Sequence, residues 1–597
     1  MECAFCPARA EGAALSTDNF QERLKSASRT AADYLISQMN ADGYWEGHLS
    51  SSALSTATAI SALSLAENPS DKAAILSGVT WLCNTQNEDG GWGDTADSPS
   101  NLSTTLLSIS ALELSMQAVD MHISLDETLA KASFYAGSYE DCVKAIQKIY
   151  GSDRTFAVPI LMNCALAGLV PWSAVPGLPF ELAVFPRSFY KTLRLQVVSY
   201  ALPALIAVGL TIHQHSPSKN PLLRAIRQLS KNIVMKRLAA LQPENGGFLE
   251  ATPLTSFVGM SLISVNGAMH PIACKCLEFI RDSQREDGSW PIDTNLSVWL
   301  TTGAISALSN AGELSKIDSA KTHKWITQQQ YTDIHPYTGA APGGWSWTHL
   351  QGGVPDADDT SGAIIALNHM DKSSKADHGV GWLLDIQNSD GGWPTFCRGW
   401  GKLPFDMSSP DITAHALRAI RTFDPDGKDP ACQRAINRGF DYLARTQRAD
   451  GAWVPLWFGN QYSPDKSNPI YGTARVIPAY VEYNQNSAEL ILSIQYILSS
   501  QNKDGSWGGA KDIHGSMEET ALAISALSYV EPTQEISDAI TQGAEFLISA
   551  VEDNIYLNPT PIGLYFASLW YSEKLYPVSW TVEALGRIIK MKHGSEK

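Results

Sequence analysis

The stretch WLLDIQNSDGGW, residues 382–393, carries the pattern that decides the fold: an apolar helical run, then Gln387, a polar turn with Gly391, and Trp393. Clear copies end at five further tryptophans and a weaker copy at a phenylalanine, namely Trp45, Trp92, Trp290, Trp453, Trp507 and Phe248. An apolar stretch rich in Ala, Leu and Ser follows each copy with helical spacing. A helix, a glycine-bearing turn and a second helix therefore form one repeating unit, and stacked units bury a shared core.

Structural roles account for most residues of this repeat. The glutamine side chain can bond backbone groups at a helix end, where carbonyls and N–H groups lack helical partners. The tryptophan ring can pack on the turn that precedes the second helix. The repeat by itself therefore indicates architecture and not chemistry.

Composition and charge narrow the class of protein. The chain has 597 residues, 44% of them hydrophobic and 18% charged, and a formal charge of −17. This length favours two large domains, and the composition is globular. No basic run is present, so nucleic acids and polyanionic substrates are disfavoured as partners. The first residues lack the features of a secretory signal, which predicts a cytoplasmic location.

Two apolar stretches bear on membrane contact. Residues 197–212 include polar Ser199 and Tyr200 and fall short of the roughly 18 to 20 apolar residues that span a bilayer. Residues 178–185 are apolar and irregular, with Pro179 among them. They either lie on a membrane or line a core, and the sequence leaves both readings open.

Three carboxylates lie within four residues of the segment VPDADDT, residues 354–360: Asp356, Asp358 and Asp359. An apolar helical run follows, so helix capping is one explanation for them. Crowded carboxylates cannot all ionise comfortably, and burial in an apolar cavity raises their affinity for a proton further. A protonated carboxylic acid in a dry site is what direct protonation of an alkene requires. Capping and acid chemistry both stay open on this reading.

The repeat and the acidic segment together resemble the squalene-hopene cyclase family. The glutamine-to-tryptophan repeat resembles the QW motifs of triterpene cyclases, and DADDT, residues 356–360, resembles the D-x-D-D-T acid motif of that family. The resemblance implies an all-α fold, a double α/α barrel (alpha toroid) with a cavity between two domains. We expect one barrel over residues 29–295, and a catalytic barrel formed by residues 1–28 and 296–597.

The resemblance also implies the catalytic residues. By position in the motif, Asp358 is the proton donor and Asp356 and Asp359 flank it. Residues 411–415, DITAH, resemble the family segment whose histidine bonds the acid, which implies that role for His415.

A tyrosine and several aromatic residues are carried over in the same way. Tyr471 resembles a family tyrosine that helps to return the proton through water, although an insertion at 458–468 precedes it. Five positions match family residues that line the substrate cavity and stabilise carbocations with their faces, or replace them with other aromatics: Trp299, Trp347, Phe396, Trp457 and Tyr565. Ordinary core packing is the alternative for each of them. The family's glutamates that position water for the final deprotonation are replaced by Thr56 and Leu107, so the product need not be hopene.

The implied activity is that of a terpene cyclase. Asp358 would protonate the terminal alkene of squalene, or of a related linear polyprenyl, and cyclisation through carbocations would give a pentacyclic hopene-like or other polycyclic product. No cofactor and no metal are implied. The expected partners are the polyprenyl substrate, a second copy of the chain in a homodimer, and the cytoplasmic face of the cell membrane, with peripheral attachment and no nucleic acid.

Two other functions are weighed against this one. A class II diterpene-type cyclase uses a similar acid on a prenyl diphosphate, which it anchors with basic residues and magnesium. The acidic charge and the six clear repeats argue against it. A metal-binding reading of Asp356, Asp358 and Asp359 is also disfavoured, because these acids lack the D-D-x-x-D spacing that chelates magnesium. A non-catalytic alpha toroid that binds a lipid explains the repeats and the cavity, but not the acid and histidine.

Overall fold

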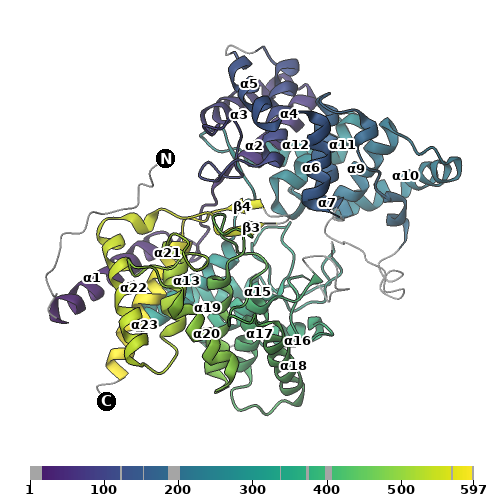
Figure 1. The fold of residues 1–597 in the computed structure, drawn as a ribbon. Helices are drawn as coiled ribbons and strands as arrows, with labels where there is room; N and C mark the ends of the chain where they lie inside the picture. Colours follow the sequence, from purple (N-terminus) through teal and green to yellow (C-terminus); the bar gives the residue numbers. More distant parts are fainter. Residues whose placement is uncertain are drawn as a thin grey trace.

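The computed structural model describes residues 17–120, 124–151, 154–185, 202–336, 338–371, 376–396, 406–565 and 569–594. Within these ranges the chain is mainly helical, with a few short strands. Figure 1 shows two helical bodies, one built from α2 to α12 and the other from α1 and α13 to α23.

Each body is a ring of inner helices surrounded by outer helices. In the first barrel the inner helices are α2 (Ala53–Ala66), α4 (Leu102–Ala118), α7 (Arg154–Leu166), α9 (Leu202–His215) and α11 (Thr252–Asn266), and the outer ones are α3 (Lys72–Asn84), α5 (Asp126–Ala136), α6 (Tyr139–Tyr150), α10 (Pro221–Leu241) and α12 (Pro271–Asp282). In the second barrel the inner helices are α13 (Ser297–Ala311), α15 (Ala357–Met370), α17 (Pro410–Phe423), α19 (Pro469–Glu482), α21 (Met517–Leu527) and α23 (Tyr576–Gly594). Its outer helices are α1 (Thr17–Ser37), α14 (Ser319–Gln328), α16 (Ala376–Ile386), α18 (Pro430–Thr446), α20 (Ala488–Ser499) and α22 (Gln534–Glu552).

An inner helix such as α15 is buried on nearly every side, whereas an outer helix such as α18 buries one face. The expected all-α double barrel is confirmed.

Each repeat holds its turn at three points, as the copy at Trp393 illustrates. The Trp393 indole donates a hydrogen bond of 2.8 Å to a carbonyl near the end of α16, and its backbone N–H donates to Thr413 Oγ1 at 3.0 Å. Gln387 Nε2 donates to the carbonyls of Gly391 and Ala435 at 2.8 and 2.9 Å. The glutamine thus joins its own turn to the start of the next outer helix, α18. The structural reading of the repeat is therefore correct.

A threonine on an inner helix accepts the backbone N–H of the aromatic residue in every described turn of this kind. The pairs are Trp45 with Thr301, Trp92 with Thr105, Phe248 with Thr255, Trp290 with Thr56, Trp345 with Thr360, Trp393 with Thr413, Trp453 with Thr473 and Trp507 with Thr520. The threonine of the acid motif, Thr360, therefore has the same structural role as its counterparts in repeats that carry no acid.

The copy at Trp345 was not among the repeats found in the sequence. Its glutamine, Gln330, lies thirteen positions before Gly343, whereas Gln387 lies four before Gly391. Gln330 Nε2 nevertheless donates to the Gly343 carbonyl at 2.8 Å. The insertion lengthens the turn without changing how it is held.

The first barrel is inserted into the second between α1 and α13. Helix α1 packs against α22 and α23, and Arg23 forms ion pairs with Glu545 at 2.7 Å and Glu552 at 2.8 Å. Strands β1 (Ser51–Ser52) and β2 (Trp290–Pro291) pair antiparallel where the chain crosses between the barrels. The boundary expected between residues 28 and 29 falls within α1, and the division into domains stays a prediction.

The apolar segment 178–185 lies partly in the core and partly at the surface, and contact with a membrane stays a prediction. Phe180 is buried, whereas Leu182 and Phe185 are 46% and 42% exposed. The short 3-10 helix η3 (Phe180–Val184) packs on α10 and α9. In the part of the chain that the structure describes, no helix has both the length and the hydropathy to cross a membrane.

Replacing Thr520 with valine tests the role of the repeat threonine. The variant leaves the buried Trp507 N–H without its acceptor, and we expect the free energy of unfolding to fall by about 1–3 kcal/mol. Thermal unfolding followed by circular dichroism should show a lower midpoint. Thr541→Val is the matched control, because Thr541 is exposed and its hydroxyl bonds the Ser537 carbonyl of its own helix. Equal midpoints for the two variants would contradict this role.

Candidate active site

Four inner helices of the second barrel each contribute a side chain from the same position of the repeat to one cavity. Trp299, Asp358, Asp411 and Tyr471 each lie two positions before a repeat threonine, in the first turns of α13, α15, α17 and α19. All four line a cavity of about 290 Å³, which His415, Arg418 and Arg475 complete. One structural position thus carries four different side chains, and in this way a repetitive scaffold builds an asymmetric site.

Two carboxyls of the acid motif are buried and bind protons strongly. Asp356 is the N-cap of α15, where its Oδ1 accepts the Asp359 N–H at 2.8 Å, so capping explains this residue. Burial is the main cause that raises the pKa of Asp356 to about 7. Burial, followed by the charge of Asp356, raises the pKa of Asp359 well above its ordinary value. The motif therefore retains protons that exposed carboxyls lose at neutral pH.

Asp358 is the carboxyl of the motif that is partly exposed. Its side chain is 19% exposed, and its Oδ1 lies 2.5 Å from Nδ1 of His415 on α17. One helical turn before the histidine, Asp411 is buried, and burial together with the charge of Asp358 raises the pKa of Asp411 to about 6. The bond to His415 orients the Asp358 carboxyl while that carboxyl remains in the lining of a larger pocket.

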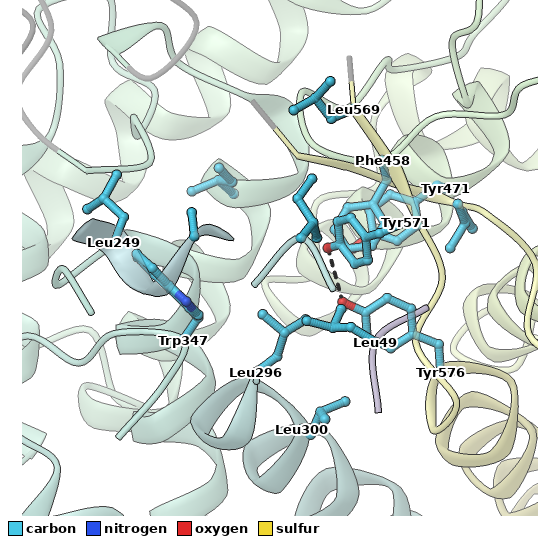
Figure 2. Close-up of a cluster of buried hydrophobic side chains, with 14 of the residues drawn as sticks. Leu49, Leu249, Leu296, Leu300, Trp347, Phe458, Tyr471, Leu569, Tyr571 and Tyr576 are labelled. Atoms are coloured by element: carbon cyan, nitrogen blue, oxygen red, sulfur yellow. Dashed lines mark hydrogen bonds between the residues drawn. The ribbon is translucent and has the colours of Figure 1, made fainter. Parts of the chain in front are cut away.

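An aromatic pocket lies in front of Asp358, with about 610 Å³ of space, part of it open to solvent. Figure 2 shows Trp347 on one side of this region and Phe458, Tyr571 and Tyr576 on the other. The hydroxyl oxygens of Tyr571 and Tyr576 lie 3.3 Å apart.

The structure brings four of the five expected cavity residues to this pocket: Trp299, Trp347, Phe396 and Trp457. Trp347 Nε1 donates to Asp293 at 3.1 Å and Trp457 Nε1 donates to Thr395 at 2.5 Å, which fixes both rings. The fifth, Tyr565, ends strand β3 (Gly563–Tyr565), but its side chain lies outside the described part of the structure.

Tyr471 lies behind this pocket and not in its lining. Its ring stacks on Phe458 with 4.0 Å between ring centroids, and it lines the smaller cavity together with Asp358. Burial raises the pKa of Tyr471 well above its ordinary value, so its hydroxyl is neutral.

Sequence reasoning missed six lining residues: Leu296, Thr395, Phe458, Leu564, Tyr571 and Tyr576. Phe458 directly follows Trp457, and this adjacency is the one signal in the sequence that points to it. Leu564 and Tyr571 belong to a hairpin of β3 and β4 (Leu569–Tyr571), which lies between the barrels and carries no repeat pattern.

The two positions expected to depart from the family pattern lie in the first barrel. Thr56 is the repeat threonine that accepts the Trp290 N–H at 3.0 Å, and Leu107 is buried in α4. Neither side chain is a carboxylate. Their match to the family's glutamates stays a prediction.

Within the described ranges, no group of three His, Cys, Asp or Glu side chains is placed to hold a metal ion. His415 bonds the Asp358 carboxyl through Nδ1. The chemistry that the described site offers is therefore proton transfer beside an aromatic cavity.

Family models match most of the chain. The N-terminal domain of squalene-hopene cyclases matches residues 29–123, and the C-terminal domain matches residues 296–554. The prenyltransferase alpha-alpha toroid domain matches residues 182–340.

Individual relatives are distant. A terpene cyclase–glycosyl transferase fusion protein from Humicola fuscoatra is 24% identical over 96% of this chain and 51% of its own length, so the chain spans about half of that relative. The squalene–hopene cyclase of Alicyclobacillus acidocaldarius is 25% identical over 75% of this chain and 77% of its own.

A solved structure, ent-copalyl diphosphate synthase from Streptomyces platensis, superposes with a TM-score of 0.59 at 18% identity and covers 95% of this chain and 99% of its own. It shows the same fold. Both domain models of squalene-hopene cyclases match this double barrel. The chain therefore belongs to the squalene-hopene cyclase family of class II terpene cyclases.

Proposed function

We propose that the protein is a class II terpene cyclase in which Asp358 protonates the terminal alkene of squalene or a related linear polyprenyl. One observation carries the proposal: a carboxyl bonded to His415 at 2.5 Å lies in the lining of an aromatic pocket. A lipid-binding toroid without activity has no need for this pair.

The proposed reaction begins with a proton transfer. The O–H bond of the Asp358 acid breaks, the alkene's π electrons form a new C–H bond, and a tertiary carbocation and a carboxylate result. Further double bonds of the chain then attack the cation and close rings, until loss of a proton or capture of water ends the reaction. The aromatic faces of Trp299, Phe396 and Trp457 would stabilise the positive charge without quenching it.

The pocket lining supports a hydrocarbon substrate over a prenyl diphosphate. Apart from its carboxyls and Thr395, the described lining is apolar or aromatic, and it holds no lysine or arginine. A diphosphate in this pocket would face the acid motif without a basic partner, which is electrostatically unfavourable. We therefore propose a polyprenyl hydrocarbon as the substrate, and the identity of the product stays open.

A membrane surface would supply such a substrate, and α10 has the features of a membrane-binding helix. Leu222, Ile226, Leu229 and Ile233 form one stripe along it, and they are 68%, 44%, 79% and 50% exposed. The helix also carries five basic and no acidic residues, in a chain with a charge of −17. An apolar stripe with basic neighbours suits the surface of an anionic membrane.

We propose that α10 and the adjoining η3 attach the protein peripherally to such a membrane. The exposed Leu182 and Phe185 lie on and beside η3, which packs on α10, and they extend the apolar surface. Assembly as a homodimer and location on the cytoplasmic side stay predictions from the family resemblance.

Asp358→Asn should fold normally and lose cyclisation, because an amide cannot deliver the proton. We expect turnover of squalene in detergent to fall by at least roughly 10²–10⁴-fold, measured by gas chromatography and mass spectrometry. Asp441→Asn, on the exposed face of α18, is the control and should retain full activity. Geranylgeranyl diphosphate is assayed in parallel, because turnover of that substrate alone would favour the diterpene-type reaction. Retained squalene turnover by Asp358→Asn would refute the assignment of the acid.

The raised pKa of Asp356 predicts how stability depends on pH. The folded protein keeps a proton on Asp356 up to about pH 7, whereas the unfolded chain loses it near pH 4. The stability that this proton contributes is therefore complete below about pH 4 and is lost as pH rises through 7.

Asp356→Asn keeps a capping oxygen but does not titrate. Compared with wild type, this variant should gain in its free energy of unfolding as pH rises from 4 to 8, because only the wild type loses the stabilising proton of Asp356. Urea titrations at both pH values measure the difference. A difference that is the same at both values would show that Asp356 holds no proton.

Leu229→Glu combined with Ile233→Glu should reduce membrane binding. Two carboxylates on the apolar stripe oppose insertion and are repelled by anionic lipid, so binding to vesicles of phosphatidylglycerol and phosphatidylcholine should fall about tenfold or more. Cosedimentation measures the bound fraction. Ile491→Glu with Leu492→Glu is the matched control, because these apolar residues are 58% and 40% exposed on α20 of the other barrel. An equal effect of the two pairs would argue against α10 as the membrane-binding surface.

A further inference from the structure

A polar cavity lies along the axis of the second barrel, behind Asp358. It has about 680 Å³ of space and is lined by side chains of α13, α15, α17, α19 and α23. His415, Arg418 and Arg475 line both this cavity and the smaller one that contains Asp358. The acid therefore has an aromatic pocket in front of it and a charged cavity behind it.

Two of the three arginines around this axis have carboxylate partners. Arg418 binds Glu482 at 2.9 Å, and Arg587 binds Glu583 at 3.0 Å. Arg475 differs, because among the described residues its buried Nε has no hydrogen-bond partner. Arg475 interacts with Tyr471, Glu583 and Asp358 instead.

Arg475 is placed to act on the acid. It lies two positions after the repeat threonine Thr473, as His415 lies two positions after Thr413, so equivalent positions of neighbouring helices supply both side chains. The guanidinium carbon lies 5.2 Å from the centroid of the Tyr471 ring and 5.4 Å from that of Trp580. These two rings fix the charge in the cavity that Asp358 lines.

We propose that Arg475 is a positioning residue for the proton donor, whose positive charge stabilises the carboxylate that Asp358 becomes when it protonates the substrate. This inference rests on the proposed function. Proton transfer turns a neutral acid into an anion, so a fixed cation nearby stabilises the product side of that step more than the reactant side. Burial lowers the pKa of Arg475, whereas interactions with Tyr471, Glu583 and Asp358 raise it, and the net effect is a pKa above the ordinary value.

Other charged and titratable groups around Arg475 come from every helix that faces it. They are Asp358 and His369 on α15; Asp411, His415 and Arg418 on α17; Tyr471 and Glu482 on α19; Tyr529 after α21; and Tyr576, Glu583 and Arg587 on α23. Glu583 also interacts with Arg475, but its hydrogen bonds go to Arg587. Burial raises the pKa of Tyr529, so its hydroxyl adds no charge and accepts bonds from Arg418 and Arg587. Asp358 is therefore the carboxyl of the cavity whose charge changes during the reaction.

The test compares Arg475→Met, which removes the charge, with Arg475→Lys, which keeps it. The first readout is infrared spectroscopy, in which the protonated-carboxyl band that Asp358→Asn lacks is followed from pH 3 to pH 9. Without the cation the carboxylate is less stable, so in Arg475→Met the midpoint of this band should move to higher pH by about one unit or more. In Arg475→Lys it should stay close to that of wild type.

The second readout is squalene turnover. We expect kcat of Arg475→Met to fall roughly tenfold or more with little change in KM, and Arg475→Lys to restore most of it. Arg421→Met is the matched control, because Arg421 also lies over a tyrosine ring, that of Tyr483, at 5.4 Å but lines neither cavity.

The outcomes are distinguishable. An unchanged infrared midpoint in a folded Arg475→Met would overturn the inference, even if the melting temperature and kcat both fall, because that result is what a purely structural role predicts. A shifted midpoint in a protein that turns over no polyprenyl would support the electrostatic role and refute the proposed function. If Arg475→Met does not fold, Arg475→Gln is measured against Arg475→Lys with the same criterion.

Discussion

One buried hydrogen bond, repeated from turn to turn, governs this architecture: the backbone N–H of an aromatic residue donates to a threonine hydroxyl on an inner helix. The bond fixes the first turns of these inner helices relative to the turns that contain the aromatic residues. Equivalent positions of successive helices consequently face the barrel axis at the same depth. At one such depth the second barrel holds four different side chains, those of Trp299, Asp358, Asp411 and Tyr471. At the next depth it holds His415 and Arg475. The repeat fixes the positions of these side chains, and the residue type at each position determines the chemistry.

The two sides of the acid differ in polarity. In front, the aromatic residues offer electron-rich faces, which a carbocation requires. Burial makes charge expensive, so Asp356, Asp359 and Asp411 bind protons more tightly than exposed carboxyls. Behind the acid, a cavity with room for polar groups brings charged side chains close to Asp358.

Different parts of the molecule were predictable from the sequence to different degrees. The repeat could be found because Gln387 and its counterparts lie at a fixed distance from their glycine, and the copy at Trp345 escaped because an insertion breaks that spacing. Asp358 and His415 are 57 positions apart, so only the family resemblance could pair them. Tyr571 comes from a hairpin outside the repeats, where no local pattern indicates proximity to the acid. Arg475 could have been found by counting from Thr473, had the repeat threonine been recognised first.

The contact between α1 and the last helices has a consequence for how the chain is made. Arg23 and Glu545 are 522 positions apart, yet they form part of the same outer wall. At roughly 5–20 residues per second of synthesis, α1 leaves the ribosome about half a minute to two minutes before its partners exist. During that time its apolar face has nothing to pack against, while the first barrel can already form from contiguous sequence. The second barrel can close only after translation has produced α22 and α23, so its assembly waits for these two helices.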